Sequence, residues 1–275
     1  MKNNFLKNIS IYSLLLFFSA IFAGPFVWLL STALKSSDEN IFRYPPSFIP
    51  EKPTFSNFIE VWNTIPMATY FFNSAIVAVI SIALNLIFSS LSAYPLARME
   101  FKGKNFFFYL ILSTMMIPFQ VIMIPIFIIC MKLNLTNSYL GVILPTSVSA
   151  FGIFLMRQAY LDIPKELEET ALIDGCSPFQ IWFKILVPLT KPAMATLGVF
   201  SFVASWSDFL WPLIILKDTS KYTLPVGISY LAGAFSANWR LISAGSIISI
   251  IPILIIFLFL QRFFIGGATE GAVKG

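Results

Sequence analysis

The sequence predicts an all-α integral membrane protein with about six transmembrane helices. Hydrophobic residues make up 57% of the 275 residues, charged residues make up 11%, and the mean hydropathy is +0.82. A soluble domain carries about 25% charged residues. Charge-free runs long enough to cross a bilayer, about 20 residues, recur along the whole chain. Buried helices of a soluble protein would not repeat this length so often, so we expect a membrane protein.

The expected helices follow the charge-free runs. They cover residues 11–34, 70–97, 106–131, 139–160, 191–215 and 241–262. Lys2 and Lys7 precede the first run in the manner of a signal peptide. Its apolar stretch continues to Leu34, beyond the roughly 7–15 residues of a cleavable segment, so we interpret it as a retained anchor. The fifth run is interrupted by Asp208 and then resumes.

The basic residues predict the orientation. Arg98, Lys102 and Lys104 lie in one short loop, against Lys132 alone in the next. Cytoplasmic loops are enriched in lysine and arginine, so we expect the first of these loops, and with it both termini, in the cytoplasm. The chain then divides into a cytoplasmic N-terminus (1–10), a transmembrane domain (11–262) with an outer loop at 36–67, and a cytoplasmic C-terminal tail (263–275).

The composition excludes several classes of function. The sequence has no histidine, which removes most general-base, triad and zinc schemes. It has no G-x-x-x-x-G-K-[ST] loop to hold the phosphates of ATP. The basic residues form no stripe that would follow a nucleic acid. We therefore expect no catalytic residue, metal site or cofactor on this chain, no nucleic-acid partner, and no enzymatic activity of its own.

The segment 162–190 is predicted to form two short helices joined at Gly175. Asp162 is placed to cap the first helix, with Pro164 in its first turn. Glycine in the left-handed conformation commonly ends a helix, which suits Gly175. Acidic residues crowd the first half of this helix, where they suit its dipole: Glu166, Glu168 and Glu169.

The second helix of this segment has its own start signal. Ser177 is predicted to cap it, with Pro178 at the first position and Gln180 completing a capping box, and Pro188 is predicted to end it. Apolar residues at helical spacing share one face: Ile181, Trp182, Ile185 and Leu186. Such a segment either docks on a protein or lies on the membrane as an amphipathic loop. Its acidic face disfavours an anionic lipid surface.

The residues of this segment resemble the EAA motif of ATP-binding-cassette importer permeases. The motif continues from the Glu-Ala-Ala triplet through three residues to a glycine, and later to a proline. Glu169-Thr170-Ala171, Gly175 and Pro188 occupy these places here. Thr170 departs from the usual alanine, and Val187 stands where leucine is usual. Both changes leave the resemblance in place.

Other stretches resemble carbohydrate permeases of the same class, in the same order along the chain. Ser207 and Asp208 take the places of the asparagine and glutamate of a W-N-E-F-x-x-P-L motif. The stretches are residues 44–50, 53–58, 73–74, 92–98, 117–120, 206–213, 223–227 and 271–275. Together they identify the chain as similar to the second, maltose-type permease subunit of sugar importers.

The resemblance implies partners and a mechanism. The subunit would pair with a homologous second permease in the bacterial cytoplasmic membrane, surrounded by lipid. A dimeric ATP-binding subunit would carry ATP and magnesium, and an extracytoplasmic sugar-binding protein would deliver the sugar. The segment that docks on the ATPase would include Glu169, Thr170, Ala171, Asp174 and Gly175. ATP-driven closure would then switch the permease between inward-facing and outward-facing states, because the two states differ in these contacts.

Two further polar residues are candidates to line the translocation pathway. Asp208 is an intramembrane carboxylate, which faces either a water-filled cavity or a hydrogen-bonding partner on a neighbouring helix. Gln120 lies between two prolines, where a broken helix would expose backbone to a cavity. For Trp206 and Trp211 we favour packing over stacking on a sugar.

Two rival functions remain open at this point. An ion-coupled secondary transporter usually shows internal repeats and an ion-coupling carboxylate deep in the membrane. The sequence shows no clear repeat, and only Asp208 would serve as that carboxylate. A channel subunit would not need the segment 162–190.

Overall fold

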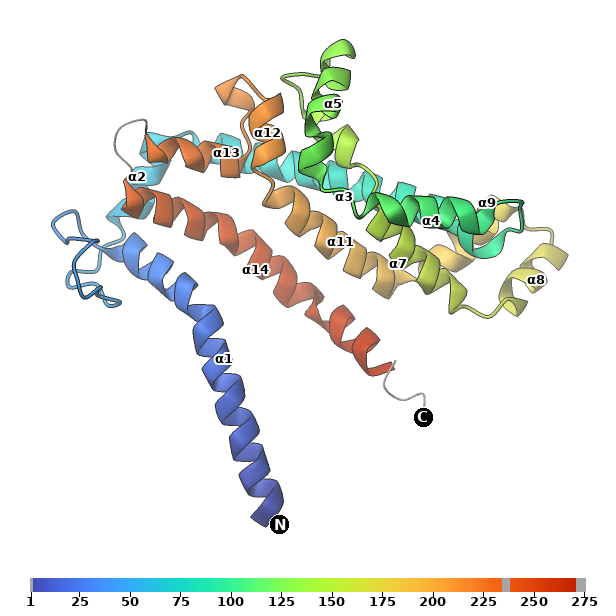
Figure 1. Cartoon of the computed structure of the whole chain (residues 1–275), viewed down its shortest axis with the longest axis horizontal. Helices are drawn as coiled ribbons and strands as arrows, with labels where there is room; N and C mark the ends of the chain where they lie inside the picture. Colours follow the sequence, from blue (N-terminus) through green and yellow to red (C-terminus); the bar gives the residue numbers. More distant parts are fainter. Residues whose placement is uncertain (1, 234–237, 271–275) are drawn as a thin grey trace. The chain divides into compact units, whose positions relative to one another are not determined.

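The computed structural model describes residues 2–233 and 238–270, and within these ranges the chain is helical with no strand (Figure 1). The residues 271–275, which resembled the end of a carbohydrate permease, lie outside the described part. The helices are α1 (Lys2–Leu34), α2 (Ser56–Thr64), α3 (Met67–Arg98), α4 (Lys104–Thr114), α5 (Phe119–Lys132), α6 (Tyr139–Ile143), η1 (Leu144–Thr146), α7 (Ala150–Leu161), α8 (Glu166–Ile173), α9 (Pro178–Ile181), η2 (Trp182–Leu186), α10 (Val187–Leu189), α11 (Lys191–Trp206), α12 (Leu210–Ile215), η3 (Thr219–Lys221), α13 (Leu224–Ser229), η4 (Tyr230–Ala232) and α14 (Trp239–Glu270).

Three helices are long and apolar enough to cross a membrane unaided, and three bent helix pairs bring the possible number of spans to six. The single helices are α1, α3 and α14. The pair α4 and α5 is bent by 98°, α6–η1 and α7 by 47°, and the helix at Pro178–Leu189 meets α11 at 80°. The number of apolar spans agrees with the prediction.

The predicted spans 106–131, 139–160 and 191–215 are each broken into shorter helices, and breaks were expected near Gln120 and at Asp208 but not within 139–160. Pro118 biases the residue before it away from the helical conformation, so α4 ends in a turn and α5 begins at Phe119. Ser149 caps α7 by accepting a hydrogen bond from the Gly152 amide, 3.0 Å away. Asp208 accepts from the Trp211 amide at 3.4 Å as α12 begins. A side chain that hydrogen-bonds to the backbone competes with the helical hydrogen bonds. The breaks at Ser149 and Asp208 follow from this competition, and the break at Pro118 follows from proline.

The chain divides into two compact units. The first contains residues 1–67 and 227–251. In it, Asn57 of α2 donates from its amide nitrogen to the carbonyl oxygens of Ala33 and Lys35, both at 2.8 Å. The ammonium of Lys35 is fully buried and donates to the Ser47 carbonyl at 2.8 Å. These bonds hold the predicted outer loop against the end of α1, and α2 is a helix in this loop that the sequence analysis did not predict.

The second unit contains residues 68–226 and 252–275, and nearly all of α3 belongs to it. The helices α7, α8, α9 and α11 contribute to one buried cluster around the last turns of α3. Its members are Ala93, Tyr94, Leu96, Ala97, Phe108, Ile153, Met156, Tyr160, Ala171, Ile181, Trp182, Leu186 and Leu197. The segment 162–190 is thus part of the core of this unit rather than a loop lying beside it.

The first turns of α3 are joined to the residues before α13. Asn73 donates from its amide to the carbonyl oxygens of Ser220 and Tyr222, both at 2.9 Å. The Ser74 hydroxyl accepts from the Leu224 amide at 2.7 Å. These are two of the stretches that resembled carbohydrate permeases, and here they bind each other. Buried side-chain amides of this kind fix irregular backbone that would otherwise lack partners.

Candidate functional site

The segment 162–190 has the helix–glycine–helix form that the sequence predicts. Gly175 has a positive φ of 81°, and α8 ends just before it. Ser177 accepts from the Gln180 amide while the Gln180 side chain accepts from the Ser177 amide, at 3.4 and 2.8 Å. The predicted capping box is therefore confirmed, and so is the turn at the glycine.

One predicted boundary of this segment was wrong, and another lies one residue from its predicted place. Asp162 does not cap α8, because it lies at the end of α7 and its amide bonds back to Gln158. Pro164 keeps the backbone before it out of the helical conformation, so α8 begins only at Glu166. The second helix runs through the π-helical turn η2 into α10 and ends at Leu189, one residue beyond the predicted Pro188. Proline has no backbone N–H to donate within a helix. The changed i→i+5 hydrogen bonding of the π turn lets the helix continue past this residue.

An ion pair attaches α8 to α3. The Arg98 Nε lies 2.6 Å from the Glu168 Oε1, and the two side chains are only 4% and 13% exposed. The same guanidinium also donates to the Ile163 carbonyl. Burial raises the pKa of Glu168, and the positive charges of Arg98 and Lys165 oppose this rise. The sequence analysis named Arg98 as a topology signal and Glu168 as part of an acidic helix start, but it missed their pairing, because residues 70 positions apart carry no joint signal in one sequence.

A buried hydrogen-bond network attaches the second half of the segment to the same helix. The Trp182 Nε1 donates to the Ser90 hydroxyl at 3.0 Å, and Ser90 and Tyr160 share a hydrogen bond of 2.6 Å. All three polar groups lie in the core of the unit. A satisfied network of this kind makes the arrangement of helices rigid, because breaking any member leaves a buried polar group unpaired.

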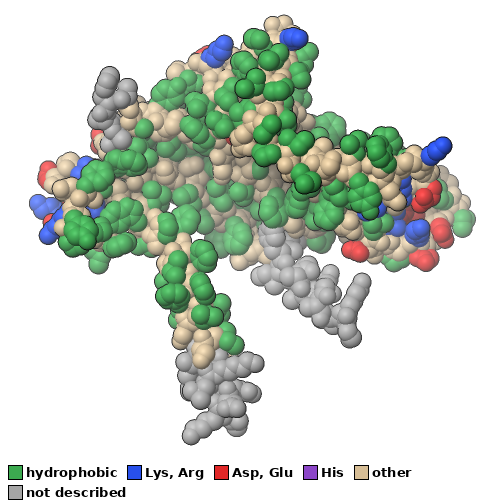
Figure 2. Space-filling model, in the orientation of Figure 1, with side chains coloured by type: hydrophobic (Ala, Val, Ile, Leu, Met, Phe, Trp, Pro, Cys, Tyr) green, Lys and Arg blue, Asp and Glu red, His purple; other side chains and the backbone are tan. Residues whose placement is uncertain are grey.

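The opposite face of the segment is exposed and mixed in character. The predicted docking residues Glu169, Thr170, Asp174 and Gly175 all lie at the surface, whereas Ala171 is buried in the core. Large apolar side chains stand exposed beside the acidic ones, and the Ile173 side chain is 86% exposed. Leu172 and Phe179 are also exposed. Figure 2 shows acidic and basic side chains gathered at the end of the unit where α8 lies.

A second site is a cavity of about 430 Å³ lined by α3, α5, α6, η1, α11 and the break between α11 and α12. It brings together Gln120 and Asp208, the two residues predicted to line a pathway. The other lining residues are Val77, Ser81, Asn85, Phe119, Val142, Thr146, Ser201, Ala204 and Ser205. In the part of the chain that the structure describes, the Ser81 and Ser201 hydroxyls have no hydrogen-bond partner, although their residues are only 5% and 8% exposed.

Asn85 is a cavity residue that the sequence analysis missed. Its side-chain oxygen accepts from the Ser89 hydroxyl at 2.7 Å and from the Ser149 hydroxyl at 3.3 Å. Its position in the middle of an apolar run was the available signal, since an intramembrane polar residue usually faces protein or a cavity. The packing predicted for the tryptophans is confirmed: Trp206 and Trp211 are both buried, and the Trp211 Nε1 donates to the Gly141 carbonyl at 3.1 Å.

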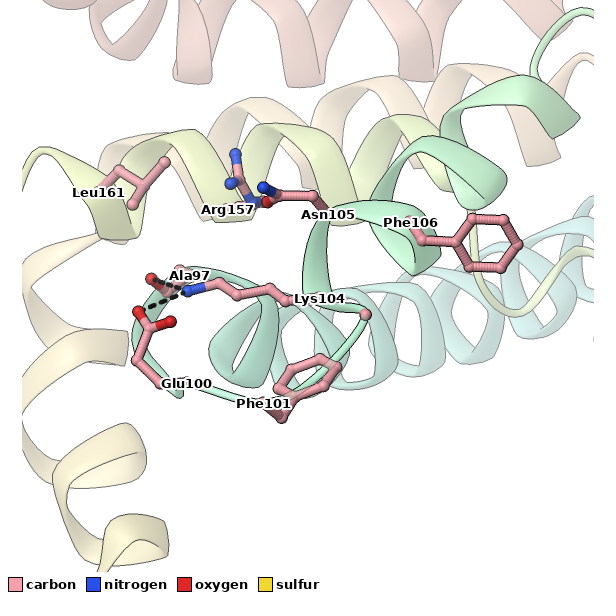
Figure 3. Close-up of a pocket in the computed structure, with 9 residues that line it drawn as sticks. Ala97, Glu100, Phe101, Lys104, Asn105, Phe106, Arg157 and Leu161 are labelled. Carbon is pink, nitrogen blue, oxygen red and sulfur yellow. Dashed lines mark hydrogen bonds and ion pairs between the residues drawn. The ribbon is translucent and has the colours of Figure 1, made fainter.

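A pocket of about 420 Å³ lies where α3 turns into α4 (Figure 3). Lys104 reaches back to the Ala97 carbonyl and the Glu100 carboxylate, both at 3.3 Å. The Arg157 guanidinium lies 4.0 Å from the centre of the Phe108 ring and donates to the Leu96 carbonyl at 3.1 Å. Lys104, first interpreted as a topology signal, and Arg157 thus hold the end of α3 from which Arg98 reaches α8.

Comparison with known proteins identifies the family to which this chain belongs. Residues 85–267 match the model of the family described as binding-protein-dependent transport system inner membrane component, and this range is more than half of the chain. The chain belongs to this family. The permease is therefore a multi-pass protein of the bacterial cytoplasmic membrane and a subunit of an ATP-binding-cassette importer. The family consists of transport permeases rather than enzymes, and this confirms the resemblance over the rival secondary transporter.

Individual relatives cover most of the permease. It is 43% identical over 229 residues, 83% of this chain and 82% of the relative, to the arabinooligosaccharides transport system permease protein AraQ of Halalkalibacterium halodurans. It is 35% identical, over 91% of this chain and 88% of the relative, to the sulfoquinovosyl glycerol transport system permease protein SmoH of Agrobacterium fabrum. Among solved structures, a chain of a bacterial transporter that imports the acidic polysaccharide alginate matches with a TM-score of 0.81 and 25% identity, covering 96% of this chain and 98% of that one.

Proposed function

We propose that this permease forms half of the translocation pathway of a sugar importer and receives its driving force through the segment 162–190. The exposed face of α8 and the Gly175 turn carries this proposal. Acidic and large apolar side chains lie side by side there. Exposed apolar residues beside charged ones are typical of a surface that a protein partner covers.

The ion pair and the hydrogen-bond network behind this face support a role in transmitting movement from the partner to the transmembrane helices. A partner that pulls on α8 displaces α3 through Arg98, and a pull on η2 reaches α3 and α7 through Trp182 and Tyr160. The proposed partner is a dimeric ATP-binding subunit that carries ATP and magnesium. A homologous second permease completes the pathway, and an extracytoplasmic sugar-binding protein delivers the substrate. Gln120 and Asp208 line this subunit's half of the pathway.

The first test is reconstitution of the four components in proteoliposomes. The similarity to AraQ makes arabinotriose the first sugar to measure. We expect uptake that requires ATP and continues when ion gradients are dissipated. The permease purified alone should hydrolyse no ATP, because its sequence has no phosphate-binding loop. Uptake that follows an ion gradient without ATP would contradict the proposal, and so would hydrolysis by the clean isolated chain.

The proposed orientation places both termini and the segment 162–190 in the cytoplasm. We expect a cysteine at Lys165 to react with a membrane-impermeant maleimide only after the cells are opened, and one at Thr219 to react in intact cells. Both positions are exposed. The measurement needs a Cys176→Ala background, because Cys176 is partly exposed whereas Cys130 is buried. The reverse labelling pattern would invert the orientation and remove the docking role.

A further inference from the structure

The cavity that holds Asp208 and Gln120 offers hydrogen bonds without a positive charge. Its lining contains one carboxylate, two side-chain amides and four hydroxyl groups. None of the described lining residues is lysine or arginine. Among the residues that the structure describes, the buried hydroxyls of Ser81 and Ser201 have no hydrogen-bond partner, so a ligand in the cavity could supply one. Buried polar groups are costly when unpaired, which makes this lining receptive to a ligand rich in hydroxyls.

The chemistry of the lining matches a sugar ring. Carboxylate and amide oxygens accept hydrogen bonds from sugar hydroxyls, and the serine hydroxyls both donate and accept. The ring of Phe119 also lines the cavity and forms an edge-to-face pair with Trp211, with the ring centres 5.6 Å apart. Ligand sites typically combine such an apolar wall with a few convergent polar groups.

The charge of the lining is selective. An ionised Asp208 repels an anionic substrate, and a protonated Asp208 leaves that anion in a confined site without a counter-charge. The start of α5 contributes Phe119 and Gln120 to the lining, but a helix start supplies only about half a positive charge. It does not balance a carboxylate together with an anionic ligand.

We propose that this cavity is a binding site for uncharged sugars and that Asp208 makes it discriminate against acidic ones. The proposal rests on the pathway role proposed above. This selectivity would distinguish the permease from relatives that carry acidic sugars, since the proteins similar to it include a transporter of the acidic polysaccharide alginate as well as permeases named for arabinooligosaccharides. On this basis the substrate of the permease carries no carboxylate, sulfonate or phosphate group.

The experiment compares two derivatives of arabinotriose whose terminal ring is open in both: the neutral alditol made by reducing the reducing end, and the aldonic acid made by oxidising it. Binding is measured by tryptophan fluorescence on the assembled complex of both permeases and the ATPase, without the sugar-binding protein. We expect the acid to bind at least about tenfold more weakly than the neutral alditol. Asp208→Asn should narrow this difference to less than about threefold, because asparagine keeps the oxygen that accepts from Trp211 but removes the charge.

Two further variants complete the experiment. Asp38→Asn removes the same charge at an exposed position that does not line the cavity, and it should leave the difference between the probes unchanged. Gln120→Lys adds a cation that balances Asp208, and it should narrow the difference between the probes as Asp208→Asn does. Equal binding of both probes to the unmodified complex would overturn the selectivity while leaving the pathway in place. Failure of the neutral alditol to bind at any soluble concentration would overturn both proposals.

Discussion

Reversing the charge of Arg98 should abolish sugar uptake while leaving the permease in the membrane. Arg98→Glu places two carboxylates together where the structure has a buried ion pair. Breaking a buried pair by changing one partner costs about 3–5 kcal/mol, because the other charge is left uncompensated. We expect α8 to detach from α3, so that ATP hydrolysis no longer responds to the loaded binding protein. Uptake and stimulated hydrolysis in proteoliposomes measure both effects.

The neighbouring glutamates provide a matched control for this experiment. Glu168→Arg alone should fail as Arg98→Glu does, and the double exchange should restore a substantial part of uptake because it rebuilds the pair with opposite polarity. Glu169→Arg changes an exposed residue on the same helix. The double variant Arg98→Glu with Glu169→Arg should therefore not recover sugar uptake. Wild-type uptake by both single variants would show that the ion pair transmits nothing.

Replacing Gly175 with valine should weaken the association with the ATPase. The φ of 81° lies in the left-handed region, where a β-branched residue is strained by about 1–3 kcal/mol. An added Cβ meets no atom within 4 Å, so any effect comes from the backbone and not from a collision. The turn should shift, and the two short helices should no longer present one surface. Retention of the ATPase during purification in detergent is the measurement.

The variant Gly175→Asn tests whether the effect of Gly175→Val comes from the backbone conformation or from the loss of glycine itself. Asparagine adopts the left-handed conformation more readily than other residues that carry a Cβ. Gly175→Asn should therefore retain more ATPase than Gly175→Val, and its uptake should be closer to that of the unmodified permease. Equal loss in both variants would mean that the partner needs the bare backbone of glycine at this position.

Local signals in the sequence predicted local structure well. The capping box at Ser177 and the turn at Gly175 depend on a few neighbouring residues, and the structure contains both. The predicted total of six apolar spans agrees with three long helices and three bent pairs, if each pair counts as one span. The breaks within spans were harder to predict. Pro25, Pro95, Pro125 and Pro252 lie inside continuous helices, whereas Pro118 precedes a new one.

The site required information that no local pattern contains. Arg98 and Glu168 meet because α3 and α8 pack together, and Gln120 and Asp208 share a cavity because α5 and the break before α12 lie close together. The resemblance to a known family indicated the segment, but it directed attention to Glu169 on the exposed face. Deciding which of two adjacent glutamates faces inward requires the orientation of α8, which its neighbours in space determine.

The two attachments of the segment 162–190 have a mechanical consequence. Ser90 and Arg98 are separated by eight residues of α3, or about 12 Å at the 1.5 Å rise per residue of a helix. A single pivot would let the segment swing freely about α3. Two pivots at this distance leave only rotation about the line that joins them, so a force applied at Gly175 in any other direction tilts α3 together with the segment.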